Sequence, residues 1–233
     1  MVLATENFHS TFIRAASHFY WHLRRKSDTQ AFHKKIQVEF TEVVQSEEEY
    51  DDDLQPIIYP VGPDFNHENI IDLRIQPGKM YGIRIINNSD VALYPFLFFF
   101  DNSDFSIGQY CLCGFLTLCV SMRSLVTYYE PPTSANTGKV DPPLLPKSSV
   151  TIGYGPEGGV PYTYYLRDAQ NIDVGYLKLF LFTQHVDLSH VPQSSPFAQV
   201  SPSAFHHNDA TVKTMPTCDI ILISIIQQEG VAH

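Results

Sequence analysis

The chain has 233 residues, of which 44% are hydrophobic and 17% are charged, so it is long and apolar enough to bury one substantial core. Its formal net charge of −10 disfavours binding to nucleic acids and to anionic membrane surfaces, because their phosphates repel an acidic protein. We therefore expect a globular protein whose partners are neither nucleic acid nor membrane.

The first segment has the periodicity of an amphipathic helix. Between Phe8 and Lys26, apolar side chains recur at steps of three and four residues and so share one face. Either Thr5 or Asn7 is a suitable N-cap, and the basic run 24–26 suits the last turn, where cations meet the negative end of the helix dipole. The pattern predicts a helix that ends near Ser27.

The pattern then changes to the alternation of strands, beginning with Ile36, Val38 and Phe40. Further short segments are rich in β-branched or aromatic residues and are bounded by turn formers: 70–75, 80–87, 92–100, 150–154, 162–166, 175–183 and 219–227. No helical pattern separates them. We therefore predict a mainly β fold, an antiparallel β-sandwich of immunoglobulin-like or jelly-roll-like type with one N-terminal helix. Pro95 removes a ladder hydrogen bond, which places its strand at an edge or a bulge.

Three segments are predicted to lie outside regular structure. Residues 47–53 contain six acids around Tyr50 and are expected to form a solvated linker. This linker divides the chain into 1–53, with the helix and first strand, and a sandwich domain at 54–233. Residues 130–147 hold five prolines and are expected to form a loop, and 191–216 a mobile loop.

The sequence also bears on the cellular compartment. No secretory signal is readable at the start, and the longest apolar stretches are far shorter than the roughly 20 residues that span a bilayer. Four cysteines, three of them crowded together, do not resemble a disulfide framework in a chain of this size. We expect reduced thiols and a cytoplasmic location.

One motif matches a nucleotide-binding pattern by its letters alone. Residues 153–158 read G-x-G-x-x-G, which in a dinucleotide fold precedes a helix whose N-terminus holds the pyrophosphate. Here another strand-like segment follows, and Glu157 would place an anion beside the phosphates. We interpret the motif as a glycine-rich hairpin and expect no cofactor.

Two residue sets have partial metal-ligand spacing. His18 and His22 lie four apart on one face of the predicted helix, but Phe19 stands where a zincin motif has Glu, and a third ligand is not evident. We expect an interfacial histidine pair. Cys111, Cys113 and Cys119, with Cys218, lack the paired C-x-x-C knuckles of zinc sites, so apolar packing is expected.

Catalytic patterns are weak as well. The serines lack a G-x-S-x-G elbow, and residues 187–190 place Asp, Ser and His too locally for a triad. Asp168 and Asp173 are close enough in sequence to pair as carboxylates, but the segment 167–171 is typical of a polar turn. We assign no catalytic residue and expect no enzyme activity.

Several stretches together resemble the region that follows the caspase-like peptidase domain in mushroom-type fungal proteins. They are 16–25 (ASHFYWHLRR), 37–41 (QVEFT), 92–95 (ALYP), 151–155 (TIGYG), 173–181 (DVGYLKLFL) and 186–189 (VDLS). The resemblance runs from about Ala15 to Phe197 and implies an accessory β domain without its peptidase. No histidine is followed by glycine and no cysteine stands in a caspase-type context, so the catalytic dyad of those enzymes carries over to no position here.

One departure from the resembling sequences is informative. They run from Asp-Phe-Ser-Ile almost directly into Tyr-Tyr-Glu-Pro-Pro, whereas here these motifs, at 104–107 and 128–132, are separated by a cysteine-rich stretch. We predict an insertion at about 110–127, such as an intron translated in frame, which would account for three of the four cysteines.

The leading functional expectation is a non-catalytic accessory or protein-interaction module, whose helix packs on its own sheet or on a caspase-like peptidase domain. The alternative is a lectin-like or small-ligand-binding sandwich. In that case exposed aromatic rings at strand ends would contact the ligand or partner: Tyr154, Tyr162 and Tyr164.

Overall fold

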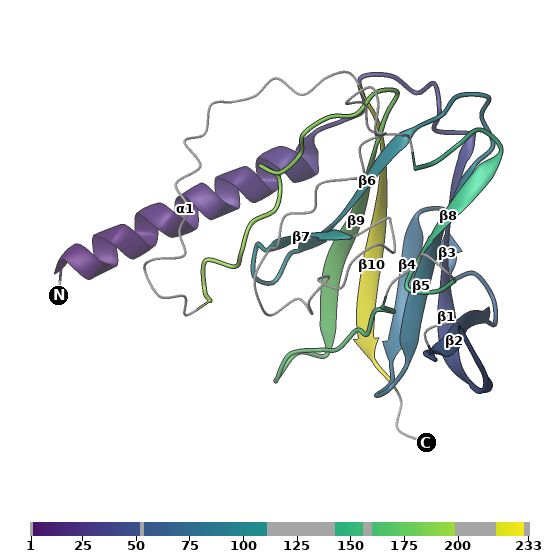
Figure 1. Ribbon diagram of the computed structural model, residues 1–233. Coiled ribbons are helices and arrows are strands. Elements are labelled where there is room, and N and C mark those ends of the chain that lie inside the picture. Colours follow the sequence, from purple (N-terminus) through teal and green to yellow (C-terminus); the bar gives the residue numbers. More distant parts are fainter. Residues whose placement is uncertain (1, 52–53, 111–142, 156–159, 199–217, 231–233) are drawn as a thin grey trace.

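The computed structural model describes residues 2–51, 54–110, 143–155, 160–198 and 218–230. In these ranges it contains the helix α1 (Val2–Arg24) and ten strands (Figure 1). The strands are β1 (Ile36–Tyr50), β2 (Pro56–Val61), β3 (Asn66–His67), β4 (Ile70–Ile75), β5 (Met80–Asn87), β6 (Tyr94–Asp101), β7 (Ile107–Tyr110), β8 (Ser148–Ile152), β9 (Ile172–Phe182) and β10 (Asp219–Glu229). The predicted mainly β fold with one N-terminal helix is confirmed.

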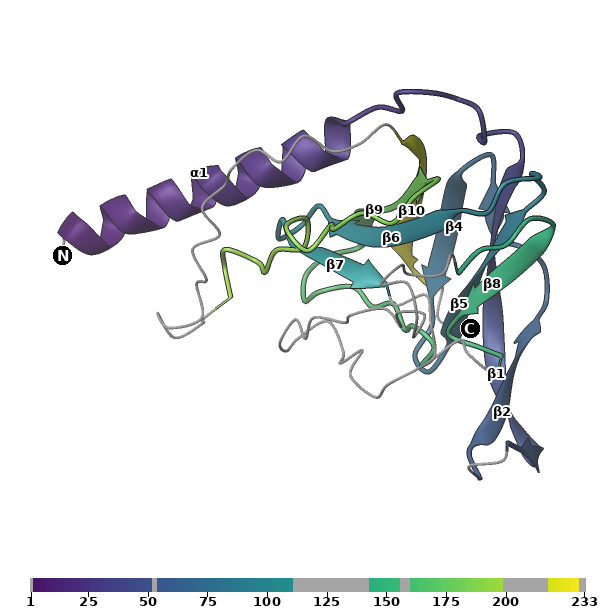
Figure 2. The same cartoon turned by 45° about the horizontal axis from the view of Figure 1, so that its top comes forward.

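The strands form two sheets that pack as a sandwich (Figure 2). One sheet has the order β2-β1-β5-β8 and the other β3-β4-β10-β9-β6-β7. Neighbouring strands are antiparallel except β4 and β10, which are parallel, with Ile71 opposite Ile225. The two strands of this pair lie far apart in sequence, which allows the long connection that a parallel pair requires.

The inner faces of the two sheets meet in an aliphatic core. Leu177, Leu179 and Leu181 alternate along β9 and are at most 1% exposed. Ile83 and Ile85 of β5 belong to the same cluster from the opposite sheet. This alternation is the period of two that places every second strand residue on one face.

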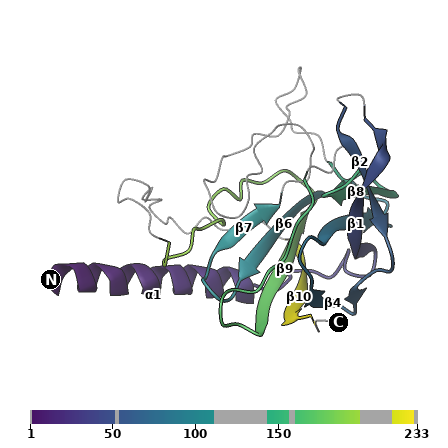
Figure 3. The ribbon, with the colours of Figure 1, turned by 90° about the horizontal axis from the view of Figure 1, so that it is seen from below.

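The central strands of the larger sheet are buried on their second face as well. Phe98 and Phe100 of β6 and Phe180 and Phe182 of β9 form a separate cluster that includes Phe19 of α1. The C-terminal half of α1 therefore covers this face, and its N-terminal end extends away from the sandwich (Figures 1 and 3). Burial on both faces explains why β6 and β9 are almost continuously apolar.

The predicted strands agree with the structure in most positions. Residues 70–75 and 80–87 match residue for residue. The strand predicted at 162–166 is wrong: only Tyr162 forms an isolated bridge, to Tyr81, because no neighbouring described strand pairs with residues 163–166. The prediction missed β2, β3 and β7, which are short or interrupted by proline or glycine.

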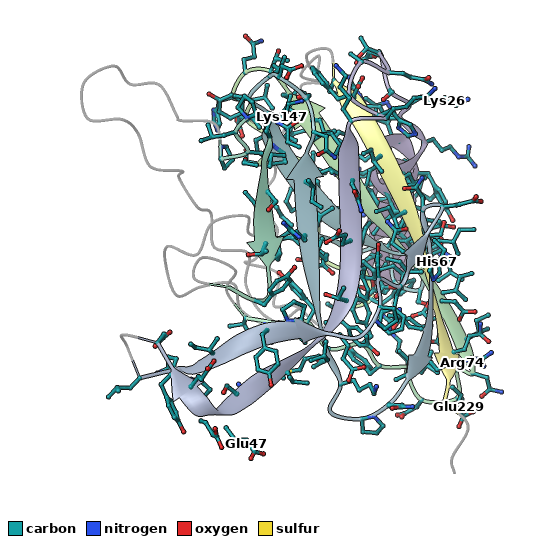
Figure 4. All side chains as sticks on the ribbon, turned by 90° about the vertical axis from the view of Figure 1, so that its right-hand side faces the viewer. Lys26, Glu47, His67, Arg74, Lys147 and Glu229 are labelled. Atoms are coloured by element: carbon teal, nitrogen blue, oxygen red, sulfur yellow. The ribbon has the colours of Figure 1, made fainter. Side chains whose placement is uncertain are left out.

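The acidic segment is not a linker. Residues 47–50 are the end of β1, which pairs with β5 from residue 36 to 43 and beyond that only with β2. Residues 44–51 and 54–61 thus form a two-stranded arm, here called the β-arm, which projects from the sandwich (Figure 4). At its tip Gln55 N donates to Asp51 Oδ1 over 2.8 Å, and Leu54 N donates to Asp51 O over 3.0 Å.

Pro95 lies at a local edge, as predicted. It stands opposite Leu181 of β9, whereas β7 pairs only with residues 97–100 of β6. The missing N–H of Pro95 therefore does not interrupt the β6–β7 ladder.

The helix begins earlier than predicted. It starts at Val2, so Thr5 and Asn7 lie inside it and the predicted caps are wrong. Its end at Arg24 agrees with the predicted stop near Ser27. Most of the predicted insertion at 110–127 and most of the loops 130–147 and 191–216 lie outside the described residues, where these expectations stay predictions.

Candidate interaction site

The inner face of α1 packs on the larger sheet through aromatic side chains. Phe19 is fully buried, and its ring centroid lies 5.4 Å from that of Phe100 and 5.4 Å from that of Phe105. About two helical turns earlier, Phe12 contacts Phe105 at 5.6 Å and Phe197 at 5.7 Å. These contacts lie on the apolar stripe that the sequence predicts.

A buried lysine of the sheet holds the C-terminal end of α1. Lys178 Nζ donates to the carbonyl oxygens of His22 at 2.6 Å, Leu23 at 2.8 Å and Arg25 at 2.7 Å. The last carbonyls of a helix have no partner within it and carry partial negative charge, so a cation at this point satisfies both their hydrogen bonding and the helix dipole. Three bonds use all three donors of one ammonium group.

The protonation state of Lys178 is consistent with this role. Its side chain is fully buried and its ammonium lies 5.4 Å from the centre of the Phe180 ring. Burial lowers the pKa of Lys178 to about 8, which still leaves the group protonated at neutral pH. The sheet therefore presents a charged cap to the helix under ordinary conditions.

The chain that follows α1 is bound to the start of β10. Ile220 N donates to Ser27 Oγ over 2.6 Å, and Asp28 N donates to the carbonyl of Cys218 over 3.1 Å. Phe32 N donates to a carboxylate oxygen of Asp219 over 2.6 Å. These bonds fix the exit of the helix to the same sheet that caps it.

A second set of polar contacts lies along the helix. Gln193 Nε2 donates to Ala15 O over 3.0 Å and to Phe105 O over 2.5 Å. His18 Nε2 lies 3.0 Å from Val191 O. Since these residues contact the middle of α1 and Lys178 its end, the sandwich fixes the direction of the helix as well as its position.

The predicted histidine pair lies in this interface. The rings of His18 and His22 are 4.5 Å apart, and His190 lies 5.8 Å from His22. The described residues contain no group of three His, Cys, Asp or Glu that would hold a metal ion. Burial, followed by repulsion from His18, His190, and the cations Lys178 and Arg25, lowers the pKa of His22 to about 3, so this ring is neutral at pH 7.

The opposite side of α1 is exposed. Its exposed side chains recur at steps of three and four and define what is here called the outer face: Ile13, Arg14, Ser17, Tyr20, Trp21 and Arg24. Ile13 is 62% exposed and Trp21 48%. The guanidinium of Arg24 lies 5.4 Å from the centre of the Tyr20 ring. A large apolar and cationic strip thus faces outward on a helix that the sandwich holds in place.

The three tyrosines named as contact residues pack against different parts of the sandwich: Tyr162 and Tyr164 against the aliphatic core, and Tyr154 over Gly82 of β5. Tyr154 is 8% exposed, and its ring lies over the place where Gly82 has no Cβ. Tyr162 bonds through its backbone to Tyr81, and its ring lies 4.2 Å from that of Tyr110. Tyr164 approaches Tyr110 with a hydroxyl-to-hydroxyl distance of 3.2 Å. The structure does not gather these three rings on one open surface.

The glycine motif lies after β8. Gly153 and Gly155 have φ angles of 84° and 78°, a conformation that favours glycine. Residues 156–159 lie outside the described residues, and residues 160–198 contain no helix. The helix that a dinucleotide loop requires is therefore missing from the described segment that follows it.

The two aspartates considered as a carboxylate pair have different surroundings. Asp168 is exposed in a turn in which Gln170 N donates to Arg167 O over 3.0 Å. Asp173 is buried and pairs with Arg167 at 3.1 Å; the same guanidinium binds Asp101 at 2.6 Å. The predicted polar turn is confirmed, and Asp173 belongs to an ion-pair network.

The remaining sequence candidates are local or lie outside the described residues. Ser189 N donates to Asp187 Oδ1 over 2.9 Å, which is a turn contact. Cys218 is buried and free, and burial raises the pKa of its thiol. The other three cysteines, 111, 113 and 119, lie outside the described residues.

Sequence reasoning missed Lys178. The signal was present in its neighbours: Tyr176, Phe180 and Phe182 share its face of β9 and are all aromatic. A single lysine inside such a face is buried if the strand is covered on both sides, and a buried lysine needs oxygen acceptors.

Comparison with known proteins finds no matching family model, no similar curated protein and no similar solved structure. In the described part of the chain, no helix combines the length and apolar character needed to cross a membrane.

Proposed function

We propose that the chain is a non-catalytic protein-interaction module that binds a partner protein through the outer face of α1. The observation that carries this proposal is the contrast between the two sides of one helix. Its inner face and its end are fixed by buried aromatic contacts and by Lys178, while Ile13 and Trp21 are exposed on the other side. Tyr20 lies at the boundary, 37% exposed, with its ring 5.9 Å from that of Phe105.

This arrangement favours binding because the helix is already ordered. A partner that docks on a helix held at a fixed angle does not have to order it, and that saves conformational entropy. Tryptophan, tyrosine and arginine are the residue types most enriched where protein interfaces are strongest. The outer face has all three, in Trp21, Tyr20, Arg14 and Arg24.

The resemblance to the region after caspase-like peptidase domains supports a particular partner class. We propose a caspase-like peptidase domain as the partner and the cytoplasm as the compartment. The outer face would then be the surface that contacts the peptidase domain, and the catalytic dyad would belong to the partner.

The proposal is tested by calorimetric titration of the full chain with a purified caspase-like peptidase domain from the same genome. We expect binding that the double variant Ile13→Ser with Trp21→Ser weakens at least about tenfold, since truncating central aromatic anchors has effects of this size. The matched control is Ile70→Ser with Ile172→Ser, which alters two exposed isoleucines on the sandwich. Equal affinity of both double variants, or no binding by the wild type, would contradict the proposal.

The proposal that the chain has no peptidase activity is tested separately. The full chain is incubated with fluorogenic peptides that carry acidic or basic residues before the cleavable bond. We expect no release of fluorophore above buffer. Hydrolysis that survives purification over several columns and follows the protein peak would show an activity of the chain itself.

A further inference from the structure

Charge is distributed very unevenly along the chain. Residues 1–35 contain six Lys or Arg against two acids, a net charge of +4. Residues 36–73 contain eleven acids and no Lys or Arg, a net charge of −11. The remaining residues therefore contribute −3 to the total of −10. The acidic residues of the protein are thus concentrated in β1 and in the chain that follows it as far as β4.

Five of the six basic residues lie at residues 24–35, at the end of α1 and before β1, whereas the β-arm lies at the opposite end of β1. The N-terminal half of α1 extends to one side, and the β-arm projects on the other side in all three ribbon views (Figures 1, 2 and 3). In Figure 4 the labelled Glu47 lies on the β-arm, away from the body of the two sheets. One copy of the chain therefore does not bring its own β-arm against its own α1.

The β-arm is apolar as well as acidic. Large side chains stand out from it between the carboxylates, namely Tyr50 at 55% exposure, Leu54 at 79% and Tyr59 at 43%. An ordinary solvated charge cluster does not need them, whereas a binding surface does, because apolar contact area adds to charge attraction. Glu47, Glu48 and Glu49 on the same arm are exposed.

The outer face of α1 has the complementary character. It combines the cations Arg14 and Arg24 with the exposed apolar groups of Ile13 and Trp21. The β-arm projects from the body, the outer face of α1 faces away from the sheet that the helix covers, and each offers what the other lacks in charge. Complementary charge also speeds encounter and selects the correct partner.

We propose that the chain self-associates head to tail, with the β-arm of one copy on the outer face of α1 of a second copy. This inference rests on the proposed function, since it uses the same helix face. Because the two surfaces differ, the contact is heterologous and each copy keeps one unoccupied surface, so the assembly grows into a ring or a chain of copies. A peptidase partner that binds α1 would compete with this contact.

The test is sedimentation velocity of the full chain over a concentration series at low salt, about 20 mM, and at high salt, about 500 mM, where charge attraction is screened. We expect association at low salt that weakens at least about tenfold at high salt. Two charge-reversal proteins are compared with the wild type. The arm variant carries Glu47→Lys, Glu48→Lys and Glu49→Lys, and the helix variant carries Arg14→Glu and Arg24→Glu.

Each variant alone should be monomeric at low salt. In the helix variant the arm and the helix are both acidic, and in the arm variant the three lysines cancel the three remaining aspartates, so the arm no longer attracts the helix. An equimolar mixture of the two variants should associate again, since the unchanged arm of the helix variant meets the unchanged helix of the arm variant. The matched control for net charge changes three exposed acids away from the β-arm: Glu68→Lys, Asp168→Lys and Glu229→Lys. It should associate like the wild type.

Several results would overturn the inference. They are a wild type that is monomeric at every concentration and salt, an arm variant that associates like the wild type, or a mixture that stays monomeric. Binding of the helix to anionic vesicles of phosphatidylserine and phosphatidylcholine while the protein remains monomeric would also contradict it. If the wild type is monomeric but still binds the peptidase domain through Trp21, the inference fails and the proposed function stands.

Discussion

The ammonium of Lys178 on β9 lies 2.6 Å from the carbonyl oxygen of His22 near the end of α1. This bond joins the centre of the larger sheet to the last turn of the only helix in the described residues. Two further carbonyls, of Leu23 and Arg25, accept from the same nitrogen. The orientation of α1, and with it the exposure of its outer face, depends on this buried cation.

Replacing Lys178 with methionine should therefore loosen the helix. Methionine has a similar length but leaves three carbonyls without a donor, and we expect the free energy of unfolding to fall by about 3 kcal/mol. Hydrogen exchange should accelerate in α1 more than in β5. The control is Lys79→Met, which removes a single half-exposed ion pair with Glu42 and should cost less than about 1 kcal/mol. Equal losses in both variants would contradict the capping role.

His22 should make the protein sensitive to acid. Its pKa is lowered from 6.5 to about 3 in the folded state, so the unfolded chain binds the proton first as the pH falls. The contribution of neutral His22 to the free energy of unfolding is therefore present in full above pH 6.5. It is lost progressively as the pH falls from 6.5 to about 3. Each pH unit in this window costs about 1.4 kcal/mol.

The test compares urea unfolding of the wild type and His22→Phe between pH 7 and pH 4. Carboxylates contribute to both proteins, so the difference between the two curves isolates this histidine. We expect the variant to lose less stability on acidification, whereas the exposed control His33→Phe should follow the wild type. Parallel curves for wild type and His22→Phe would show that His22 is not the buried group described here.

Gly153 should be important for the fold rather than for a nucleotide. Its φ is +84°, and a Cβ there would lie 3.0 Å from Pro161 Cα and 3.1 Å from Tyr81 O. Gly62 has a similar φ of +76° with nothing within 4 Å. Both Ala variants should lose about 1 kcal/mol from the left-handed backbone, and Gly153→Ala a further 1 to 2 kcal/mol, roughly, from crowding. Thermal unfolding that ranks them equally would contradict this difference.

Arg167 should stabilise one end of the larger sheet. It pairs with Asp101 at 2.6 Å, Asp104 at 3.2 Å and Asp173 at 3.1 Å. Arg167→Met leaves these carboxylates without their common cation and should cost about 3 kcal/mol at pH 7. The loss should shrink at lower pH, because protonated carboxyl groups need no cation.

The ion pair of exposed Arg84 with half-buried Glu39, 3.6 Å apart, provides the control for that measurement. Arg84→Met should cost less than about 1 kcal/mol at any pH between 4 and 7. A loss for Arg167→Met that does not change with pH would indicate that its effect is packing and not charge.

Regular alternation made most of the sheet predictable. Strands β4 and β5 match the expected ranges because their hydrophobic period and their flanking turn formers agree. The helix was predictable from the stripe that contains Phe12 and Phe19, although its start was not, since no strong cap precedes Val2. Strands β2 and β7 were missed because proline in β2 and glycine in β7 are residues that strands usually lack, so these segments do not have the composition expected of a strand.

The site was less predictable than the fold. The amphipathic stripe located the inner face of α1, and its exposed remainder is the outer face. The cap by Lys178 was not predictable, because Lys178 and His22 are 156 residues apart in sequence and meet only in the folded chain. The acidic part of the β-arm differs from the predicted linker for two reasons. A run of charged residues is typical of a solvated segment, and a strand exposed on both faces has no alternation of apolar and polar residues by which to recognise it.

The most direct test of the central claim uses Trp21, the single tryptophan of the chain. The full chain is labelled with 5-fluorotryptophan, which gives one ¹⁹F resonance from the outer face of α1, and is titrated with the unlabelled caspase-like peptidase domain. We predict that this resonance shifts or broadens in step with the binding isotherm, and that it does neither when the titrant is an unrelated acidic protein. A complex that forms while the Trp21 resonance stays unchanged, or the failure of any complex to form, would contradict the account.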